Sequence, residues 1–211
     1  MPYGERSAPR LTGPIREADI VGMPQRVLRG PFTVDAYQRL GELGVLGADA
    51  RVELVDGQVV EMTPIGDRHA SVVRRLTQLF ARTLIDLALH DVQNPVVLSE
   101  RDAPQPDLTL LKHRSDGYPH HPRARDILLA VEVADTTLAY DRDVKVPLYA
   151  RARIPEAWLV DLVSERVLVY QEPAGGRYTS VRAFSRGAMI ALRCFPSITF
   201  LVDDILGSQG Q

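Results

Sequence analysis

Glu132 is the residue whose surroundings most demand a chemical explanation. It lies inside ILLAVEV (127–133), a run that is otherwise uniformly apolar. Such a run is typical of a strand that is buried on both faces. Burial of a lone ionised carboxylate is costly unless the group is paired, protonated or bound to a metal. The sequence therefore predicts a compensating group beside Glu132.

Asp107 is the carboxylate expected beside Glu132. It opens the strand DLTLL (107–111), whereas Glu132 stands near the end of the next strand. If these strands pair antiparallel across the 112–126 loop, the start of one lies beside the end of the other. Two carboxylates and a backbone carbonyl, most simply that of Val133, form a hard oxygen site that suits Mg²⁺ or Mn²⁺. Such an ion polarises a phosphodiester and lowers the pKa of its bound water, which are two routes to hydrolysis.

Lys145 and Glu53 complete the candidate catalytic set. After the strand that holds Glu132, a turn and a returning helix would bring the Lys145 ammonium near the metal. There it would orient the attacking water or stabilise charge on the phosphate. Only two of the 25 lysine and arginine residues are lysines, and a lysine retained against this bias is informative because the two side chains are not interchangeable in a site. Glu53 is a candidate further acidic ligand, although it could simply face solvent across from Val59.

The elements that must position these residues follow from apolar spacing and turn residues. Thr33 is a good N-cap for a short helix that ends near Gly44. The run RVELVDGQVVEM (51–62) places Asp56-Gly57 between two β-rich halves, which predicts a hairpin that carries Glu53. Asp67 is expected to cap the strongest helix, and the apolar stripe of that helix comprises Val72, Leu76, Leu79, Phe80 and Leu87.

The order of the remaining elements indicates a single α/β domain over residues 31–211, with a mixed, partly antiparallel sheet. A helix that contains Leu148 and Tyr149 follows the strand of Glu132, and Pro147 is expected in its first turn or at a kink. Residues 1–30 contain several prolines and no periodicity, so they are expected to form a flexible arm. Strands are expected at 95–99, 107–111, 127–133, 157–161 and 166–171, with short β-like pieces at 178–181 and 188–192.

Several other charged residues have a simpler interpretation beside a functional one. The arginines at 68, 75 and 82 recur every seven residues, which usually marks a solvated helix face and alternatively a phosphate-binding stripe. His69 either supports the site or has a helix-capping or core role. One proline-bearing loop holds His113, His120 and His121. Because this loop has no cysteines, it is a poor match to the ligand spacing of zinc sites.

Composition limits the class of protein. Apolar residues make up 45% of the 211 residues and charges are mixed throughout, so a globular domain is expected. A single cysteine, Cys194, excludes an internal disulfide and suits a reducing compartment. Because there is neither an apolar run of about 18 residues nor an apolar leader, we expect a cytoplasmic protein without a membrane span. The net charge of −2 lacks the basic excess that is usual in nucleic-acid-binding domains.

Seven segments together resemble the Uma-type restriction endonuclease family, an uncharacterised bacterial branch of the PD-(D/E)XK nuclease superfamily. No single motif is very specific, but their order and spacing are. They cover about residues 31–206 and read FTVDAYQRL, VELVDGQVVEM, RHASVVRRL, QPDLTLL, LLAVEV, DRDVKVPLYARARIPEAWLVDL and RVLVYQ.

The resemblance implies a restriction-endonuclease-like core, in which helices flank a central mixed β-sheet, with an N-terminal helix and a β-hairpin. It implies that Asp107 and Glu132 are the two metal carboxylates and that Glu53 is the family's early glutamate. Superfamily members usually carry a lysine two residues after the second acid, where this chain has Ala134. The family resembles members whose lysine has moved to the next helix, and Asp141 to Lys145 (D-x-x-x-K) fits that arrangement.

The function implied by the resemblance is cleavage of DNA by a Mg²⁺-dependent (or Mn²⁺-dependent) endonuclease, acting as a homodimer by analogy with the superfamily. One alternative is a catalytically inactive nuclease-like fold that serves as a binding or assembly module, which the near-neutral charge and Ala134 keep open. Another is a metal-dependent hydrolase of a non-nucleic phosphate ester. In the loop after the second acid, Asp135-Thr136 replaces the family's usual serine-proline, so an extra carboxylate either adds a ligand or disturbs the site.

Overall fold

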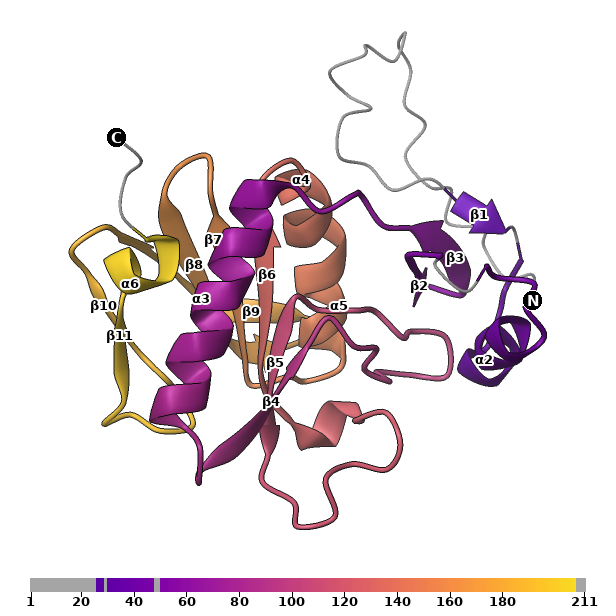
Figure 1. Cartoon of the computed structure of the whole chain (residues 1–211), viewed down its shortest axis with the longest axis horizontal. Coiled ribbons are helices and arrows are strands. Elements are labelled where there is room, and N and C mark those ends of the chain that lie inside the picture. The colour runs from indigo at the N-terminus through magenta and orange to yellow at the C-terminus, as the bar shows by residue number, and fades with distance from the viewer. Residues whose placement is uncertain (1–25, 29, 48–49, 208–211) are drawn as a thin grey trace, which may run out of the picture.

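A six-stranded mixed sheet forms the centre of the molecule (Figure 1). In the computed structural model, residues 26–28, 30–47 and 50–207 are described. The strand order is β4-β5-β6-β7-β8-β9, and β6 and β7 pair in parallel while all other neighbours are antiparallel. The bounds are Ala88–Val92, Leu108–Lys112, Ile127–Ala134, Glu156–Asp161, Arg166–Ala174 and Arg177–Ser185. The expected mixed α/β sheet is therefore confirmed.

One face of the sheet is covered by helix α3 (Asp67–Thr83), which runs across the strands in Figure 1. Its buried stripe includes Val72, Leu76 and Phe80. Phe80 packs edge-on against Trp158 of β7, with ring centroids 6.1 Å apart. The β10–β11 pair (Met189–Ala191 and Thr199–Leu201) and helix α6 (Val202–Leu206) close the same apolar core.

The connection between the parallel strands β6 and β7 supplies the apolar cover of the other face. Parallel neighbours need a long crossover, usually a helix. Here it consists of α4 (Leu138–Tyr140), a π-helical turn η2 (Asp141–Lys145) and α5 (Val146–Arg151). Tyr149 is fully buried against the sheet in this second core. Pro147 lies in the first turn of α5, as expected from the sequence.

A small N-terminal unit of one helix and three strands lies beside the main sheet (Figure 1). Helix α2 (Val34–Glu42) is capped by Thr33, whose hydroxyl accepts a 3.2 Å hydrogen bond from the Ala36 N–H. Strands β2 (Val52–Val55) and β3 (Gln58–Glu61) form the expected hairpin, and β1 (Arg26–Leu28) pairs with β3. Most of the expected arm, residues 1–25, lies outside the described residues, while its last part forms β1.

The expected strand at 95–99 is wrong, and β4 takes its place at the sheet edge. Val96 and Leu98 donate their backbone N–H groups to the 102–104 segment, whereas Val97 donates to Pro122, and only isolated bridges form instead of a ladder. Their apolar character reflects burial in a connecting segment. β4 shows little apolar signal because it is an edge strand with polar residues in its middle (ALHDV).

Two details of the α3 prediction also need correction. The N-cap residue is Gly66, and Asp67 is the first helical residue, with its charge at the positive end of the helix dipole. Leu87 does not belong to the buried stripe, because the helix ends at Thr83 and Leu87 is 45% exposed. Within the described residues, no helix has the length and apolar character needed to span a membrane.

Candidate active site

The β5–β6 hairpin brings Asp107 and Glu132 to the same end of the sheet. The strands pair antiparallel with Leu108 opposite Val131, so the residue before Leu108 lies beside the residue after Val131. The Val133 N–H donates a 2.8 Å hydrogen bond to Asp107 Oδ2. The juxtaposition expected from the sequence is present in the structure.

Three donors hold the Asp107 carboxylate. Besides the Val133 N–H, His69 Nε2 from α3 lies 2.9 Å from Oδ2, and Gln93 Nε2 donates to Oδ1 at 3.1 Å. Burial raises the pKa of Asp107, but the hydrogen bonds from His69 and Val133 and the charges of His69 and Lys145 outweigh it. The net pKa lies below the ordinary value, so Asp107 is an ionised carboxylate at neutral pH.

Glu132 has a different environment from Asp107. Its Oε1 lies 2.8 Å from Lys145 Nζ and accepts a hydrogen bond from the Tyr149 hydroxyl. Burial raises the pKa of Glu132 well above its ordinary value, and the charges of Asp141 and Asp107 raise it further, while Lys145 opposes the shift. Burial therefore disfavours the charged form of Glu132, and Lys145 is the cation that offsets this cost.

Lys145 projects from the π-helical turn η2 into the centre of the cluster, where it is 3% exposed. Its ammonium also contacts Glu53 Oε2 at 3.5 Å and donates to the Gln105 carbonyl at 3.2 Å. Burial lowers the pKa of Lys145, but Glu132 and Glu53 raise it well above its ordinary value. The residue is therefore a charged ammonium held between two carboxylates.

Glu53 contacts Lys145 rather than Asp107. Its Oε2 accepts the Gln105 N–H at 3.0 Å, and its Oε1 accepts the Tyr140 hydroxyl at 3.0 Å. Both oxygens are thus engaged by neighbours from other elements. Glu53 ties the N-terminal hairpin to the crossover that carries Lys145.

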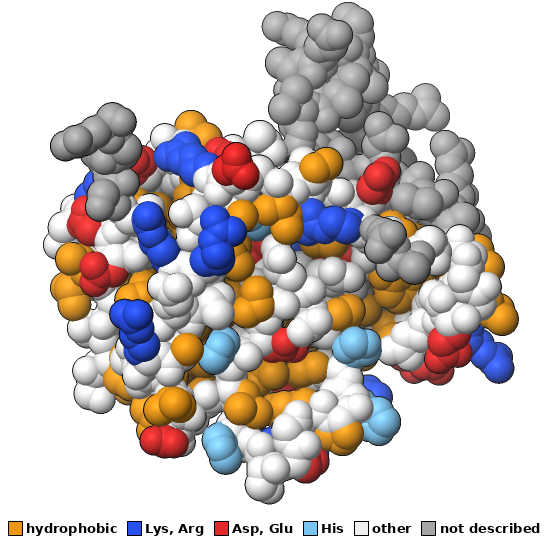
Figure 2. Space-filling model, viewed as in Figure 1, with side chains coloured by type: hydrophobic (Ala, Val, Ile, Leu, Met, Phe, Trp, Pro, Cys, Tyr) orange, Lys and Arg blue, Asp and Glu red, His pale blue; other side chains and the backbone are white. Residues whose placement is uncertain are grey.

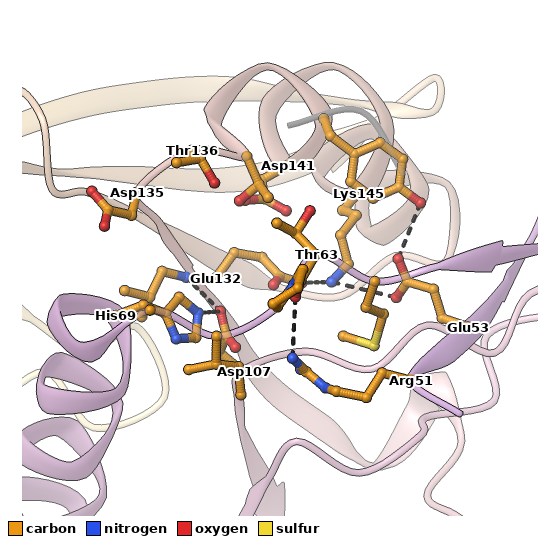
Figure 3. A pocket seen from close by; sticks show the side chains of 17 residues that line it. Arg51, Glu53, Thr63, His69, Asp107, Glu132, Asp135, Thr136, Asp141 and Lys145 are labelled. Atoms are coloured by element: carbon orange, nitrogen blue, oxygen red, sulfur yellow. Dashed lines mark hydrogen bonds and ion pairs between the residues drawn. The ribbon is translucent and has the colours of Figure 1, made fainter. Parts of the chain in front are cut away.

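A pocket of about 330 Å³ opens onto these side chains (Figure 3). Its walls come from the β2–β3 hairpin, the 62–66 segment, the start of α3, the adjoining ends of β5 and β6, and the crossover. Two further acids, Asp135 and Asp141, line it as well. The four candidate residues of the sequence analysis therefore line a single pocket.

A family match extends over most of the chain: the model described as "Uma2: Putative restriction endonuclease" matches residues 34–203. The chain belongs to the Uma2 family. A solved structure, titled as a putative nuclease belonging to DUF820 from Anabaena variabilis ATCC 29413, is similar with a TM-score of 0.68 and 13% identity. The match covers 83% of this chain and 98% of that chain, and it confirms the nuclease-like fold. No curated protein matches the chain.

The acids of this Uma2 pocket have the chemistry that a divalent cation requires. Buried carboxylates of four residues line it, against one buried ammonium. In the described ranges, no three His, Cys, Asp or Glu side chains are already arranged as a metal-ligand set. Mg²⁺ commonly binds through one or two carboxylates and keeps several waters, so Asp107 and Glu132 satisfy its protein-ligand requirement. Val133, whose carbonyl is the third expected ligand, lines the same pocket.

Sequence reasoning missed several partners in this Uma2 site. Asp141 is 5% exposed and accepts a 2.6 Å hydrogen bond from Thr137; its position one helical turn before Lys145 was the available signal. Gln93 lies in a connecting segment, and nothing in its local sequence marks it. The ring of Tyr149 packs in the second core and its hydroxyl donates to Glu132, a contact that its helical position does not indicate. His69 supports Asp107, in agreement with the functional alternative.

Figure 2 shows several basic side chains, with acidic side chains among them, on the face of the molecule that α3 covers. Arg68 donates to the Leu162 carbonyl and lies 3.7 Å from Asp135, and Arg75 donates to the Leu206 carbonyl at 3.0 Å. Two of the three arginines at 68, 75 and 82 therefore tie α3 to neighbouring segments.

Proposed function

We propose that this Uma2 protein is a metal-dependent endonuclease that hydrolyses phosphodiester bonds in DNA. The observation that carries the proposal is the meeting of Asp107, Glu132 and a buried Lys145 in one pocket. Two acids with different pKa shifts beside a fixed ammonium are typical of a catalytic centre rather than of a structural ion pair. Family membership supports the same reaction class.

In this proposal, Asp107, Glu132 and the Val133 carbonyl hold Mg²⁺ or Mn²⁺. A bound ion supplies an activated water and polarises the scissile phosphate. Lys145 stabilises the charge that develops on the phosphate, and Glu53 holds the ammonium in position at 3.5 Å. His69 and Gln93 fix the orientation of Asp107, as outer partners of metal ligands commonly do.

The quaternary state in this proposal is a homodimer, by analogy with small nucleases of the superfamily. A two-fold dimer presents two copies of the site, one for each strand of a duplex.

The proposed chemistry is tested by nicking of supercoiled plasmid DNA in Mn²⁺, comparing the wild type with Glu132→Gln. The glutamine oxygen can still accept from Lys145 and Tyr149, so the fold is retained while the charge is lost. We expect activity to fall at least about 100-fold, because preorganised electrostatic stabilisation is lost with the ligand charge.

Asp143→Asn is the matched control for this assay. Asp143 belongs to the same turn as Lys145, but it is exposed and paired with Arg142 at 2.8 Å. It should nick like the wild type. Equal nicking by the wild type and Glu132→Gln would refute the assigned chemistry. Turnover of a small phosphodiester without nicking of plasmid would instead indicate a non-nucleic substrate.

A further inference from the structure

Arg51 lines the acidic pocket without a carboxylate partner. The residue directly precedes β2, is half-buried, and reaches under Thr63 toward the middle of the pocket in Figure 3. Across the described residues its guanidinium makes a single hydrogen bond, to the Thr63 carbonyl at 3.1 Å, and no ion pair. An arginine beside four buried carboxylates that pairs with none of them calls for another anion.

The other cations of the pocket region are already paired. Lys145 contacts Glu132 and Glu53, and His69 is bonded to Asp107. Arg68, next to His69 at the start of α3, lies within 4 Å of Asp135 and Glu165. Among the basic side chains of the described pocket wall, Arg51 alone has no carboxylate partner.

The Arg51 side chain is also held in place before any ligand arrives. The Arg51 carbonyl accepts the Met62 N–H at 2.8 Å, and Arg51 Nη1 donates to the carbonyl of Thr63, the residue after Met62. The main chain and the side chain of Arg51 are therefore both bonded to the segment that follows β3. A guanidinium has five N–H donors, so four remain for an acceptor. Preorganisation of this kind reduces the entropy lost on binding.

We propose that Arg51 is the phosphate-binding residue of the pocket and that its ligand is a phosphodiester of the substrate strand. This inference rests on the proposed function. The buried carboxylates repel a phosphate, so a second cation besides the metal is needed to draw the strand in. The planar fork of arginine matches two non-bridging phosphate oxygens, which a lysine ammonium does not.

The test measures binding of a short fluorescein-labelled DNA duplex by anisotropy, over a range of salt concentrations. Ca²⁺ replaces Mg²⁺, and a gel verifies that the duplex stays intact. We expect Arg51→Gln to weaken binding about 10-fold, as loss of a charge-assisted contact predicts. The magnitude of the slope of log affinity against log salt concentration should fall by about one, which is the change expected when one phosphate contact is lost. Arg51→Lys should keep the salt slope and lose a smaller part of the affinity.

Arg75→Gln is the matched control, because Arg75 also donates to one backbone carbonyl but lies outside the pocket. It should bind DNA like the wild type. An unchanged affinity in Arg51→Gln, an equal loss in both variants, or no DNA binding by the wild type would overturn the assignment. Arg51→Lys provides the comparison should Arg51→Gln prove unstable. Since cleavage is not measured, a chain that binds through Arg51 but does not cut would contradict the endonuclease proposal alone.

Discussion

Asp107 and Glu132 lie side by side, yet their pKa values are shifted in opposite directions. Asp107 is surrounded by N–H donors from His69, Gln93 and Val133, whereas Glu132 has like charges near it and is buried more deeply. The donors stabilise the ionised form of one acid, and desolvation disfavours the ionised form of the other. A cation that binds both would add to Lys145 in stabilising the charged form of Glu132.

Asp141 gives a pH-dependent prediction at the same scale. Burial raises its pKa from 3.8 to about 6, against the opposing charge of Lys145. Between these values the native state binds a proton that the unfolded chain has lost, so the stability contributed by neutral Asp141 is complete below pH about 4 and is lost as the pH rises to about 6. In EDTA, Asp141→Asn should match the free energy of unfolding of the wild type at pH 4 and exceed it at pH 7 by about 3 kcal/mol.

Chemical unfolding at both pH values measures this difference. Asp143→Asn is the control, since the hydrogen bond from Arg142 lowers the pKa of Asp143 and its removal should not stabilise the protein at pH 7. If the free energies of unfolding of Asp141→Asn and the wild type differ by the same amount at both pH values, the pKa shift assigned to Asp141 is wrong.

The meeting of Asp107 and Glu132 could be predicted from the sequence because each acid is locally anomalous. A glutamate inside ILLAVEV and an aspartate at the start of the preceding strand point to one another through a single hairpin. Gln93 and Tyr140 could not be predicted this way. Their roles depend on where separate segments pack, and a glutamine in a connecting segment or a tyrosine in a helix is locally unremarkable.

At the scale of elements, the N-terminal hairpin decides where Arg51 and Glu53 stand. Its turn residues Asp56 and Gly57 both have positive φ, 49° and 72°, the conformation of a type I′ hairpin turn. A Cβ at Gly57 would lie 3.2 Å from the Phe32 carbonyl oxygen, in addition to the strained backbone. The turn therefore requires glycine.

Gly57→Ala should destabilise the protein by about 1–2 kcal/mol, because alanine is strained at this φ and the backbone of Phe32 must shift. The free energy of unfolding in urea measures the effect. Gly47→Ala is the control, since no atom lies within 4 Å of the added methyl and its φ is not in the positive region. Equal stability of Gly57→Ala and the wild type would show that the turn adapts without cost.

Element prediction succeeded where periodicity and turn chemistry agree and failed where burial had another cause. The hairpin at Asp56-Gly57 and the helix after Thr33 have local signals that the structure follows. The 95–99 segment is apolar because it is buried between other segments, and apolar composition alone does not distinguish such a segment from a strand. The π-helical turn that directs Lys145 into the site has no sequence signature.

For the molecule as a whole, metal binding and stability should be linked. The pocket concentrates buried negative charge in a protein whose net charge is only −2. A ligand that binds the native state alone stabilises it by RT ln(1 + L/Kd), where L is the free ligand concentration. Millimolar Mn²⁺ should therefore raise the melting temperature by about 5 °C.

Asp107→Asn should abolish this gain. The variant keeps an oxygen that can accept the Val133 N–H, so it removes the ligand charge with little loss of fold. A thermal melt with and without Mn²⁺, at matched ionic strength, makes the comparison. The same stabilisation in both proteins would place the cation elsewhere and favour a catalytically inactive fold.

The position of Lys145 in the crossover between β6 and β7 has a consequence for biosynthesis. As the nascent chain leaves the ribosome, Glu53, Asp107 and Glu132 emerge before the amine that neutralises them. The crossover can dock only after β7, the parallel partner that follows it, has also emerged. A translation product that stops before residue 145 therefore carries the acids without the ammonium, so the pocket is assembled only in a chain that extends past the crossover.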